Sequence, residues 1–457
     1  MITDLESCLQ LGKPWPPESE IDRLERYKQN EQLFDGEHTK VFQVLLKLFA
    51  SATAEYNKLI VILNWHRRLS TLWADFLFSE QPRAIASQDP ESKEQKYLDD
   101  FVKRNRYWAL MHTRQIDVSR FGHGIVEGYF DGEECRLQSV HPSKFFPSYN
   151  VTTGRITEYC IAWTGPEEVK DHIKQRTLYI RIHRAGEIES REYSISSLNK
   201  LIAGPFNAQI QETGVDQPLI SVIENLTTSS DKLVDDYGDL DTIIKRIESR
   251  LTRVGRILDV HSEPILALSE DSAALTKTTT GEYVYDSKKK IITLPPKTDY
   301  PQYITWEGQL TAAFQEIERE LQQMYTITET CEACFEPTKL GAQVSGTALR
   351  LMLWIPLKKV DRLKLAADPT ITDELLLFTE FENIKGNSKS VLLDWISIHW
   401  EDGLPEDFRE TVAAMTQLTA AGLIWDEMAL KMLYKLEGTA LQDALTKLKA
   451  QNVGGVI

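Results

Sequence analysis

Apolar side chains recur every three or four residues in two early stretches of the chain, which predicts helices there. The first runs from Asn57 to Phe78 and ends at residues 79–82, and the second lies around Lys93 to Val118. Residues 1–55 show a mixed helical and loop-like pattern with a break at WPPESE. We therefore expect the chain to begin with helices.

The hydrophobic period changes to two in the next part of the chain. The segment GIVEGYFDGEECRLQSVHP alternates apolar and polar residues around Asp131-Gly132, which is typical of a hairpin turn. Three more alternating segments follow, RITEYCIAWT, RTLYIRIHRAG and EIESREYSIS, and the last two meet at Gly186. Residues 121–200 are thus expected to form an antiparallel sheet packed on the earlier helices.

Two long apolar seams at helical spacing surround a short strand-like insert. The first seam consists of Leu240, Ile244, Ile247, Leu251, Val254 and Leu258. The second consists of Leu310, Phe314, Ile317, Leu321 and Met324. Both have the alternating spacing of four and three residues that helix pairs use. Residues 265–303 between them contain strand-like pieces (EYVYDS, KIITLPP), so we expect two paired helices with a small cap.

The segment GAQVSGTALRLMLWIPLKKVDRLK, residues 341–364, predicts one long helix with Pro356 in its interior. Proline there removes a backbone hydrogen bond and bends the helix. Residues 351–355, before the proline, are apolar on every side, as expected for burial, and a kinked core helix within one chain is one interpretation. Farther on we expect a helix at residues 372–383, a strand at 391–400, a helix at 406–421 and helices after Gly422.

The charge balance argues against a tight nucleic-acid binder. The 457 residues carry 52 Lys and Arg against 68 Asp and Glu, a net charge of -16. Proteins that bind phosphates tightly are usually basic, because counterion release drives that binding. No run of about 20 apolar residues predicts a membrane span, and the acidic start MITDLESCLQ does not indicate a secretory signal.

The five cysteines are too few and too scattered for a disulfide framework and favour a reducing compartment. Cys331 and Cys334 form one CxxC pair, CEAC. A single pair is a weak zinc signal, so we expect ordinary side chains near a helix end, with redox and metal roles as the alternatives.

No other pattern assembles a catalytic site. The phosphate loop GxxxxGK[ST] and the nucleophile elbow GxSxG are absent. The glycines around Gly122 to Gly128 are expected in turns and bulges. His66 is expected to be buried on an apolar helix face. Asp235-Asp236 and Asp239-Asp241 are expected to face water at a helix start, with a metal site as the alternative. We therefore expect no enzyme activity, no cofactor and no metal.

Three segments together resemble the portal proteins of tailed bacteriophages, the large siphovirus-type family. The first is NKLIVILNWHRRLSTLWADFLFSEQPRAI, followed by QSVHPSKFFPSYNVTTGRITEYCIAW. The second, SSDKLVDDYGDLDTIIKRIESRLTRV, is similar to the family's stem helix. The third, SGTALR (residues 345–350), resembles the start of its long kinked helix. Their order along most of the chain makes the resemblance fairly specific.

The resemblance implies an α+β, mainly helical portal fold that assembles into a ring. Its parts would be the first part of the wing (1–225), stem helix 1 (226–258), the clip (259–305), stem helix 2 (306–334), the tunnel loop (335–346), the kinked helix with the rest of the wing (347–410) and a short C-terminal helical region (411–457). The family often has a sizeable helical crown at its C-terminus. Here the crown is short or missing.

The resemblance also implies roles for particular residues. Lys339 and Gln343 of the tunnel loop would line the DNA channel, and the long helix would start at Ser345, Gly346 and Arg350. Pro356 would turn that helix from the tunnel wall into the wing, and residues 351–355 before it would be buried against neighbouring subunits. The stem cations Arg246, Arg250 and Arg253 would touch DNA phosphates or, preferably, pair with Glu316, Glu318 and Glu320 of a neighbouring stem.

The implied function is structural: a ring, usually of twelve copies, at one capsid vertex, through which double-stranded DNA passes without tight binding during packaging and ejection. The implied partners are the terminase large subunit, head-completion or adaptor proteins, and capsid and scaffolding proteins, with no membrane. The protein would be assembled in the host cytoplasm and reside in the virion. The alternatives are another virion connector or adaptor, or a nuclease or redox enzyme.

Overall fold

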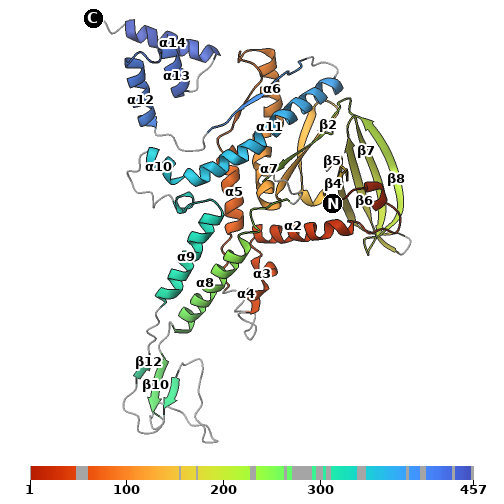
Figure 1. Ribbon diagram of the computed structural model, residues 1–457, viewed down its shortest axis with the longest axis vertical. Coiled ribbons are helices and arrows are strands. Elements are labelled where there is room, and N and C mark those ends of the chain that lie inside the picture. The colour runs from red at the N-terminus through yellow and green to blue at the C-terminus, as the bar shows by residue number, and fades with distance from the viewer. Residues whose placement is uncertain are drawn as a thin grey trace. The chain divides into compact units, whose positions relative to one another are not determined.

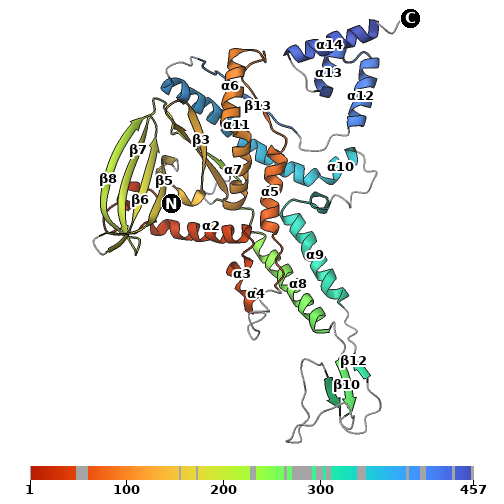
Figure 2. The same cartoon turned by 180° about the vertical axis from the view of Figure 1, so that it is seen from behind.

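The computed structural model describes residues 2–47, 60–153, 156–170, 173–226, 233–261, 265–269, 291–294, 302–304, 310–336, 346–386, 391–401, 408–434 and 438–453. Its helices and strands are drawn from two sides in Figure 1 and Figure 2. The chain divides into two units. Unit 1 consists of Met1–Phe34, His66–Gly238 and Glu329–Ile457, and unit 2 consists of Asp35–Trp65 and Asp239–Thr328. No helix within the described ranges is long and apolar enough to cross a bilayer.

Unit 1 combines helices with antiparallel sheets, so the predicted α+β class is confirmed. The helices are α1 (Leu5–Cys8), α2 (Ile21–Phe34), α5 (Trp65–Phe78), α6 (Lys93–Arg104), α7 (Tyr107–Phe121), α10 (Gly346–Met352), α11 (Trp354–Lys385), α12 (Phe408–Ala420), α13 (Asp426–Tyr434) and α14 (Gly438–Val453). The first residue of α5, Trp65, still belongs to unit 2.

Within the described part of unit 1, the strands form two larger sheets and one short pair. One sheet has the order β3-β2-β9, from β2 (His123–Phe130), β3 (Cys135–Val140) and β9 (Ile220–Glu224). The other has the order β4-β5-β6-β7-β8, from β4 (Phe145–Tyr149), β5 (Ile156–Lys170), β6 (Ile173–Arg184), β7 (Glu187–Ser196) and β8 (Leu201–Glu212). β1 (Arg83–Ile85) pairs with β13 (Ser397–His399). All these pairings are antiparallel.

The predicted hairpins are confirmed by their turn geometry. The Asp131 carboxylate accepts hydrogen bonds from the backbone N–H groups of Glu133 and Glu134 between β2 and β3. Gly132 and Gly186 adopt positive φ angles of 105° and 84°, which favour glycine. The sheet extends beyond the predicted residue 200, because β8 continues to Glu212.

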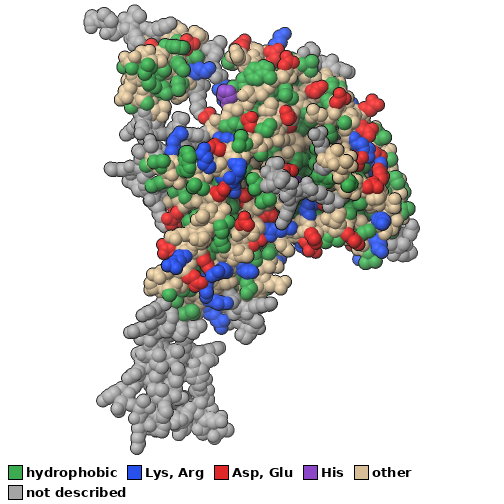
Figure 3. All heavy atoms as spheres, in the orientation of Figure 1, with side chains coloured by type: hydrophobic (Ala, Val, Ile, Leu, Met, Phe, Trp, Pro, Cys, Tyr) green, Lys and Arg blue, Asp and Glu red, His purple; other side chains and the backbone are tan. Residues whose placement is uncertain are grey.

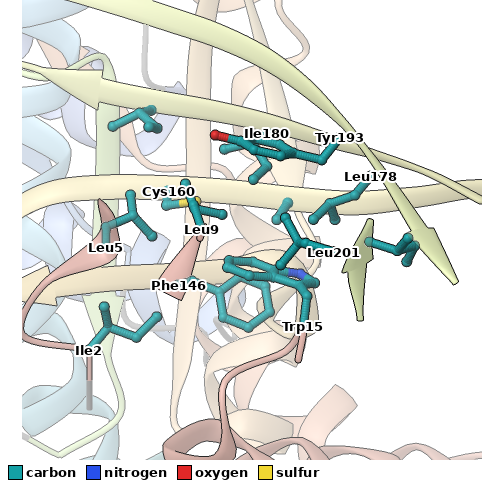
Figure 4. Packing of buried hydrophobic residues seen from close by; sticks show 13 residues of the cluster. Ile2, Leu5, Leu9, Trp15, Phe146, Cys160, Leu178, Ile180, Tyr193 and Leu201 are labelled. Atoms are coloured by element: carbon teal, nitrogen blue, oxygen red, sulfur yellow. The ribbon is translucent and has the colours of Figure 1, made fainter. Parts of the chain in front are cut away.

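The N-terminal segment covers the five-stranded sheet. Ile2, Leu5, Leu9 and Trp15 pack against Phe146 and the apolar residues of β5 to β8 in one buried cluster (Figure 4). The chain also makes bridge pairs at Ile2↔Ser148 and Pro14↔Lys200. Alternation along the strands thus supplies one apolar face for this cluster, as the period of two predicts.

Glycines of β2 allow two helices to approach the three-stranded sheet closely. A Cβ atom on Gly124 would lie 2.6 Å from Arg114 Cγ of α7, and one on Gly128 would lie 2.6 Å from the Phe378 ring of α11. Only Gly122, with a φ of 84° at the end of α7, is a turn glycine as predicted. The other two are packing positions inside a strand, so the expectation of turn and bulge glycines was wrong for them.

The helix predicted from Lys93 to Val118 is two helices, α6 and α7. The Asn105 amide donates hydrogen bonds to the carbonyls of Phe101 and Cys135, and its oxygen accepts one from Leu137 N. Arg106 then has a left-handed φ of 47°. The sequence pattern missed this break because a contact with β3, distant in sequence, fixes it.

Helix α5 begins at Trp65, later than the predicted Asn57. Residues 57–59 lie outside the described residues, and residues 60–64 are not helical. Within unit 2, Val61 N donates to Thr252 Oγ1 (3.1 Å) and Leu63 N donates to Glu248 Oε1 (2.9 Å). Side chains of residues 248 and 252, distant in sequence, therefore accept hydrogen bonds from these N–H groups, and residues 60–64 stay non-helical.

The long helix predicted around Pro356 is interrupted at Leu353, between α10 and α11. Pro356 lies in the first turn of α11, where proline is tolerated because the N–H groups there have no partner within the helix. The prediction of an interior kink at Pro356 was therefore wrong. The proline inside the helix is Pro369, and α11 continues to Lys385, so the helix expected at residues 372–383 is its last part.

The C-terminal elements follow the sequence pattern with one difference. The strand expected at residues 391–400 is reduced to Ser397–His399. Helix α12 ends at Ala420, and Gly422 has the positive φ of 70° expected at a helix break. Helices α13 and α14 follow, as predicted.

Unit 2 contains the two seamed helices. Its elements are α3 (His38–Val41), α4 (Gln43–Lys47), α8 (Asp241–His261), α9 (Thr311–Ile327), β10 (Ile265–Ser269), β11 (Ile291–Leu294) and β12 (Gln302–Ile304). The strands pair in the order β11-β10-β12. They lie within the range expected for the clip, and the predicted KIITLPP strand is β11. The predicted EYVYDS strand lies outside the described residues.

Candidate functional site

The predicted apolar seams join α8 to α9 within unit 2. Ile244, Ile247 and Val254 of α8 are buried, as are Ile317 and Met324 of α9, whereas two predicted seam residues, Leu258 and Phe314, are exposed. The two helices contact each other and lie side by side in both views (Figure 1, Figure 2). Burial of each large aliphatic side chain contributes about 1.5–3 kcal/mol, so these buried residues stabilise unit 2.

Charged side chains link the same two helices. Arg246 Nη2 lies 2.7 Å from Glu320 Oε1 and 3.4 Å from Glu316 Oε1, and Arg250 Nη2 lies 2.9 Å from Glu316 Oε1. The expected acids Glu316 and Glu320 thus pair with Arg246 and Arg250 within the same chain. The third expected acid, Glu318, is exposed.

Two shallow grooves flank these ion pairs. One, of about 350 Å³, is lined by Arg246, Ala312, Gln315, Glu316, Arg319, Glu320 and Gln323. The other, of about 220 Å³, is lined by Val44, Lys245, Arg246, Ser249, Arg250 and Arg253. Within the described part of the chain, Lys245 and Arg253 have no ion-pair partner. Figure 3 shows basic and acidic side chains intermixed in the region of α8 and α9, so this surface is mixed in charge.

The acidic residues before α8 have two different environments, and the expectation for the first pair was wrong. In unit 1, Asp235 accepts hydrogen bonds from Arg26. Asp236 is buried and accepts from Lys359 Nζ (2.9 Å), Ser119 Oγ (2.6 Å) and Asn225 Nδ2 (3.1 Å). Burial alone would raise the pKa of Asp236, but the Lys359 ammonium and these hydrogen bonds hold it below its ordinary value.

In unit 2, helix α8 begins at Asp241, whereas the range predicted for stem helix 1 begins at residue 226. Asp241 lies in its first turn, where a carboxylate favours the helix dipole. Among the described residues, no group of three His, Cys, Asp or Glu side chains is arranged to hold a metal ion. His66 is fully buried against the Tyr237 ring, as predicted for a structural histidine.

The residues implied for the tunnel loop are only partly described. Lys339, Gln343 and Ser345 lie outside the described residues. Gly346 is the first residue of α10, and Arg350 is exposed on the same helix. The helix start expected at this position is therefore found, while the channel-lining role of the loop stays a prediction.

The apolar residues at the α10–α11 junction are uncovered in the single chain. Leu351, Met352, Trp354 and Ile355 are 70%, 50%, 55% and 55% exposed, and only Leu353 is buried. Figure 3 shows hydrophobic side chains over this region. We call these four exposed residues the junction face. Contiguous exposed apolar side chains mark interaction surfaces, so the face is a candidate for contact between subunits, as the sequence predicts.

The C-terminal helices expose a second set of apolar side chains, which the sequence analysis did not single out. Its members are Leu423, Trp425, Met428, Met432 and Tyr434. Helices α12, α13 and α14 contact one another along the chain.

Buried ion pairs that the sequence analysis missed fix α11 to its neighbours. Arg114 Nη1 of α7 lies 2.6 Å from Glu374 Oε2, with both side chains 1% exposed. Arg114 also donates to Gly124 O and Ser221 Oγ, and Tyr107 donates to Glu374. Burial and the adjacent Glu374 carboxylate raise the pKa of Tyr107. An acidic residue within an apolar helix face was the signal in the sequence, because such a residue needs a buried partner.

Comparison with known families identifies the class of protein. The model of the family described as "Phage portal protein, SPP1 Gp6-like" matches residues 17–453. The chain therefore belongs to this family of phage portal proteins, and the resemblance noted from the sequence is confirmed. Its function is that of a portal connector, a structural component of the phage particle.

Solved structures give weaker likenesses. A chain from "Neck of native GTA particle computed with C12 symmetry" is 11% identical with a TM-score of 0.42, over 80% of this chain and 89% of that chain. A chain from "Neck of empty GTA particle computed with C6 symmetry" is 11% identical with a TM-score of 0.44, over 95% and 98%. Among curated proteins there is no significant match.

Proposed function

We propose that this portal protein assembles as a ring, of twelve copies as the sequence resemblance implies, at one vertex of the capsid. The observation that carries the proposal is the junction face: Leu351, Met352, Trp354 and Ile355 stay exposed in a single chain. Apolar residues in such a cluster gain free energy when a partner covers them. A neighbouring copy is the natural partner for a ring-forming family.

The ring would let double-stranded DNA pass during packaging and ejection without holding it tightly. Two observations support this. The net charge of -16 per chain opposes phosphate binding over most of the surface. Arg246 and Arg250, which could otherwise bind phosphates, are already paired with Glu316 and Glu320.

Further channel and partner assignments follow from family membership and sequence position. Lys339 and Gln343 of residues 335–346 would line the channel before α10 begins. Residues 259–305 would contact the terminase large subunit and head-completion or adaptor proteins. Capsid and scaffolding proteins would contact the wing during assembly in the host cytoplasm. The proposed role is structural, without catalysis or a cofactor.

The assembly proposal is tested by the double variant Trp354→Ser/Ile355→Ser. Both side chains are exposed, so the single chain should keep its fold. If each subunit contact loses about 3 kcal/mol of free energy from apolar burial, the protein concentration needed for ring formation should rise about a hundredfold. Mass photometry across a dilution series gives that concentration.

The matched control is Leu365→Ser, which removes another exposed apolar side chain of the same helix α11. Rings of this variant should form as in the wild type. Equal assembly of the double variant and the control would overturn the role of the junction face. A double variant with altered circular dichroism would be replaced by Trp354→Gln, which keeps a long side chain.

A further inference from the structure

Cys331 and Cys334 are held close together in a short turn. Cys331 is the N-cap residue and Cys334 the last residue of η4 (Glu332–Cys334), a 3₁₀ turn that follows the end of α9. The two sulfur atoms are 3.4 Å apart, and Cys334 N donates a hydrogen bond to the Cys331 carbonyl (3.1 Å). A disulfide needs the sulfurs at about 2.05 Å, so a small movement of the side chains would suffice. Both thiols are partly exposed.

The other cysteines are placed differently. Cys135 and Cys160 are fully buried, and burial raises the pKa of both thiols. Cys8 is partly buried, which also raises its pKa. A thiolate and not a thiol is the nucleophile in disulfide exchange. These three cysteines are therefore poor nucleophiles at neutral pH.

The turn shifts the pKa values of its two thiols in opposite directions. The Cys334 thiol can donate a hydrogen bond to the Cys331 sulfur, which lowers the pKa of Cys331 to about 6. The same hydrogen bond raises the pKa of Cys334, which keeps its proton. Cys331 thus has the properties of the attacking thiolate and Cys334 those of the second, resolving thiol. Reactive CxxC pairs show the same division of roles.

We propose that Cys331 and Cys334 form a redox-active dithiol that closes to an intramolecular disulfide by exchange with low-molecular-weight disulfides. The Cys331 thiolate attacks one sulfur of the small disulfide and breaks its S–S bond, which releases one small thiol after protonation. The Cys334 thiol then loses its proton and attacks the Cys331 sulfur of the mixed disulfide, which releases the second small thiol. Two protein thiols are oxidised and one small disulfide is reduced to two thiols.

The location gives the disulfide a structural consequence. The turn comes directly after the chain passes from unit 2 to unit 1, between Thr328 and Glu329. Glu329 already has a left-handed φ of 57°, and the Thr328 hydroxyl donates to Met324 O of α9. Closing the disulfide would fix the conformation of the turn that connects α9 to the residues before α10. This inference does not depend on ring assembly.

The first test needs no variant. The reduced full-length protein is incubated with oxidised glutathione, quenched in acid, and analysed by intact mass and peptide mapping. The expected product has lost the mass of two hydrogen atoms, with Cys331 joined to Cys334 in one peptide. Protein that keeps both thiols free, or that links other cysteines instead, would overturn the proposal.

The second test separates the roles of the two thiols. Cys334→Ser keeps a hydroxyl donor next to Cys331, so this variant should accumulate a mixed disulfide with glutathione at Cys331. Cys331→Ser should react at Cys334 about tenfold more slowly at pH 7. Cys8→Ser is the matched control and should close the disulfide at the wild-type rate. Equal reaction of the Cys331 and Cys334 variants would contradict the assignment.

Discussion

The interior of α11 and the residues around its beginning differ in how far the single chain covers their side chains. Between Lys359 and Glu382, three charged side chains are buried and are paired within unit 1: Lys359 with Asp236, Glu374 with Arg114, and Glu382 with Arg104. At the α10–α11 junction, four large apolar side chains are half exposed or more in the single chain. The two regions are consecutive in sequence.

This difference shows which part of the fold is complete by itself and which part awaits a partner. Buried charges without partners would be costly, and those of α11 have their partners within a single chain. Exposed apolar residues cost little in a monomer and give free energy only when covered. The interior of α11 is therefore stabilised within unit 1, and the junction face is the surface that we propose for contact between subunits.

The largest effect is expected from Glu374→Ala. The substitution leaves the Arg114 guanidinium buried and uncompensated, which typically costs about 3–5 kcal/mol. Urea unfolding followed by tryptophan fluorescence measures this loss. The control Glu380→Ala removes an exposed carboxylate from the same helix and should change the free energy of unfolding by less than about 0.5 kcal/mol. Equal effects of the two substitutions would show that the buried pair is not needed.

A second buried carboxylate predicts a pH dependence. Glu127 of β2 is bound by His183 and Arg181 of β6. Burial would raise its pKa, but the hydrogen bond with His183 and the charge of Arg181 lower it to about 2. Because the folded pKa lies below the unfolded value, the stabilisation is fully present above pH 4.5 and is lost as pH falls toward 2.

The free energy of unfolding is expected to fall by about 3 kcal/mol as the pH falls from 4.5 to about 2. Glu127→Gln has no carboxyl group to titrate, so its unfolding free energy should fall less steeply over the same range. Urea titrations at a series of pH values compare the two slopes. Parallel curves for the wild type and the variant would rule out Glu127 as the source.

The junction itself predicts a smaller effect for Pro356→Ala. Pro356 lies in the first turn of α11, so the substitution restores no hydrogen bond inside that helix. We expect a loss of about 1 kcal/mol from reduced packing and backbone entropy, with the interruption at Leu353 retained. Thermal unfolding gives the first quantity and a structure of the variant gives the second. One continuous helix through Leu353 would contradict this view of the break.

The exposed ion pairs of α8 and α9 predict the smallest effect. Glu316→Gln releases Arg250 and one contact of Arg246, so the affinity for duplex DNA at low salt should rise about threefold. Fluorescence anisotropy with a labelled duplex measures it. Glu318→Gln makes the same change in charge at an exposed acid and should have a smaller effect. Identical affinities of the two variants would mean that net charge, and not pairing, limits DNA binding.

Sequence patterns correctly predicted those elements that depend on residues near each other in the sequence. The hairpin at Asp131-Gly132 and the seams of α8 and α9 depend on turn chemistry and helical spacing, which neighbouring residues show. The break at Asn105 and the late start of α5 depend on contacts with Cys135 and Glu248, which are distant in sequence. No spacing rule could find these contacts.

The same distinction applies to the candidate site. The apolar character of residues 351–355 was evident from the sequence, whereas the burial of Asp236 by Lys359 was not. The pairing acids Glu316 and Glu320 were identified, but the sequence favoured a neighbouring copy where the fold places them in the same chain. Sequence patterns thus identified the chemistry of these surfaces, and the fold decided which partner each one has.

Electron microscopy of the purified wild-type protein tests the central claim most directly. The account predicts closed rings with a central opening in end-on views, and a reconstruction in which Trp354 and Ile355 are covered by the neighbouring copy. Single copies at every concentration, or rings in which this face remains open to solvent, would contradict it.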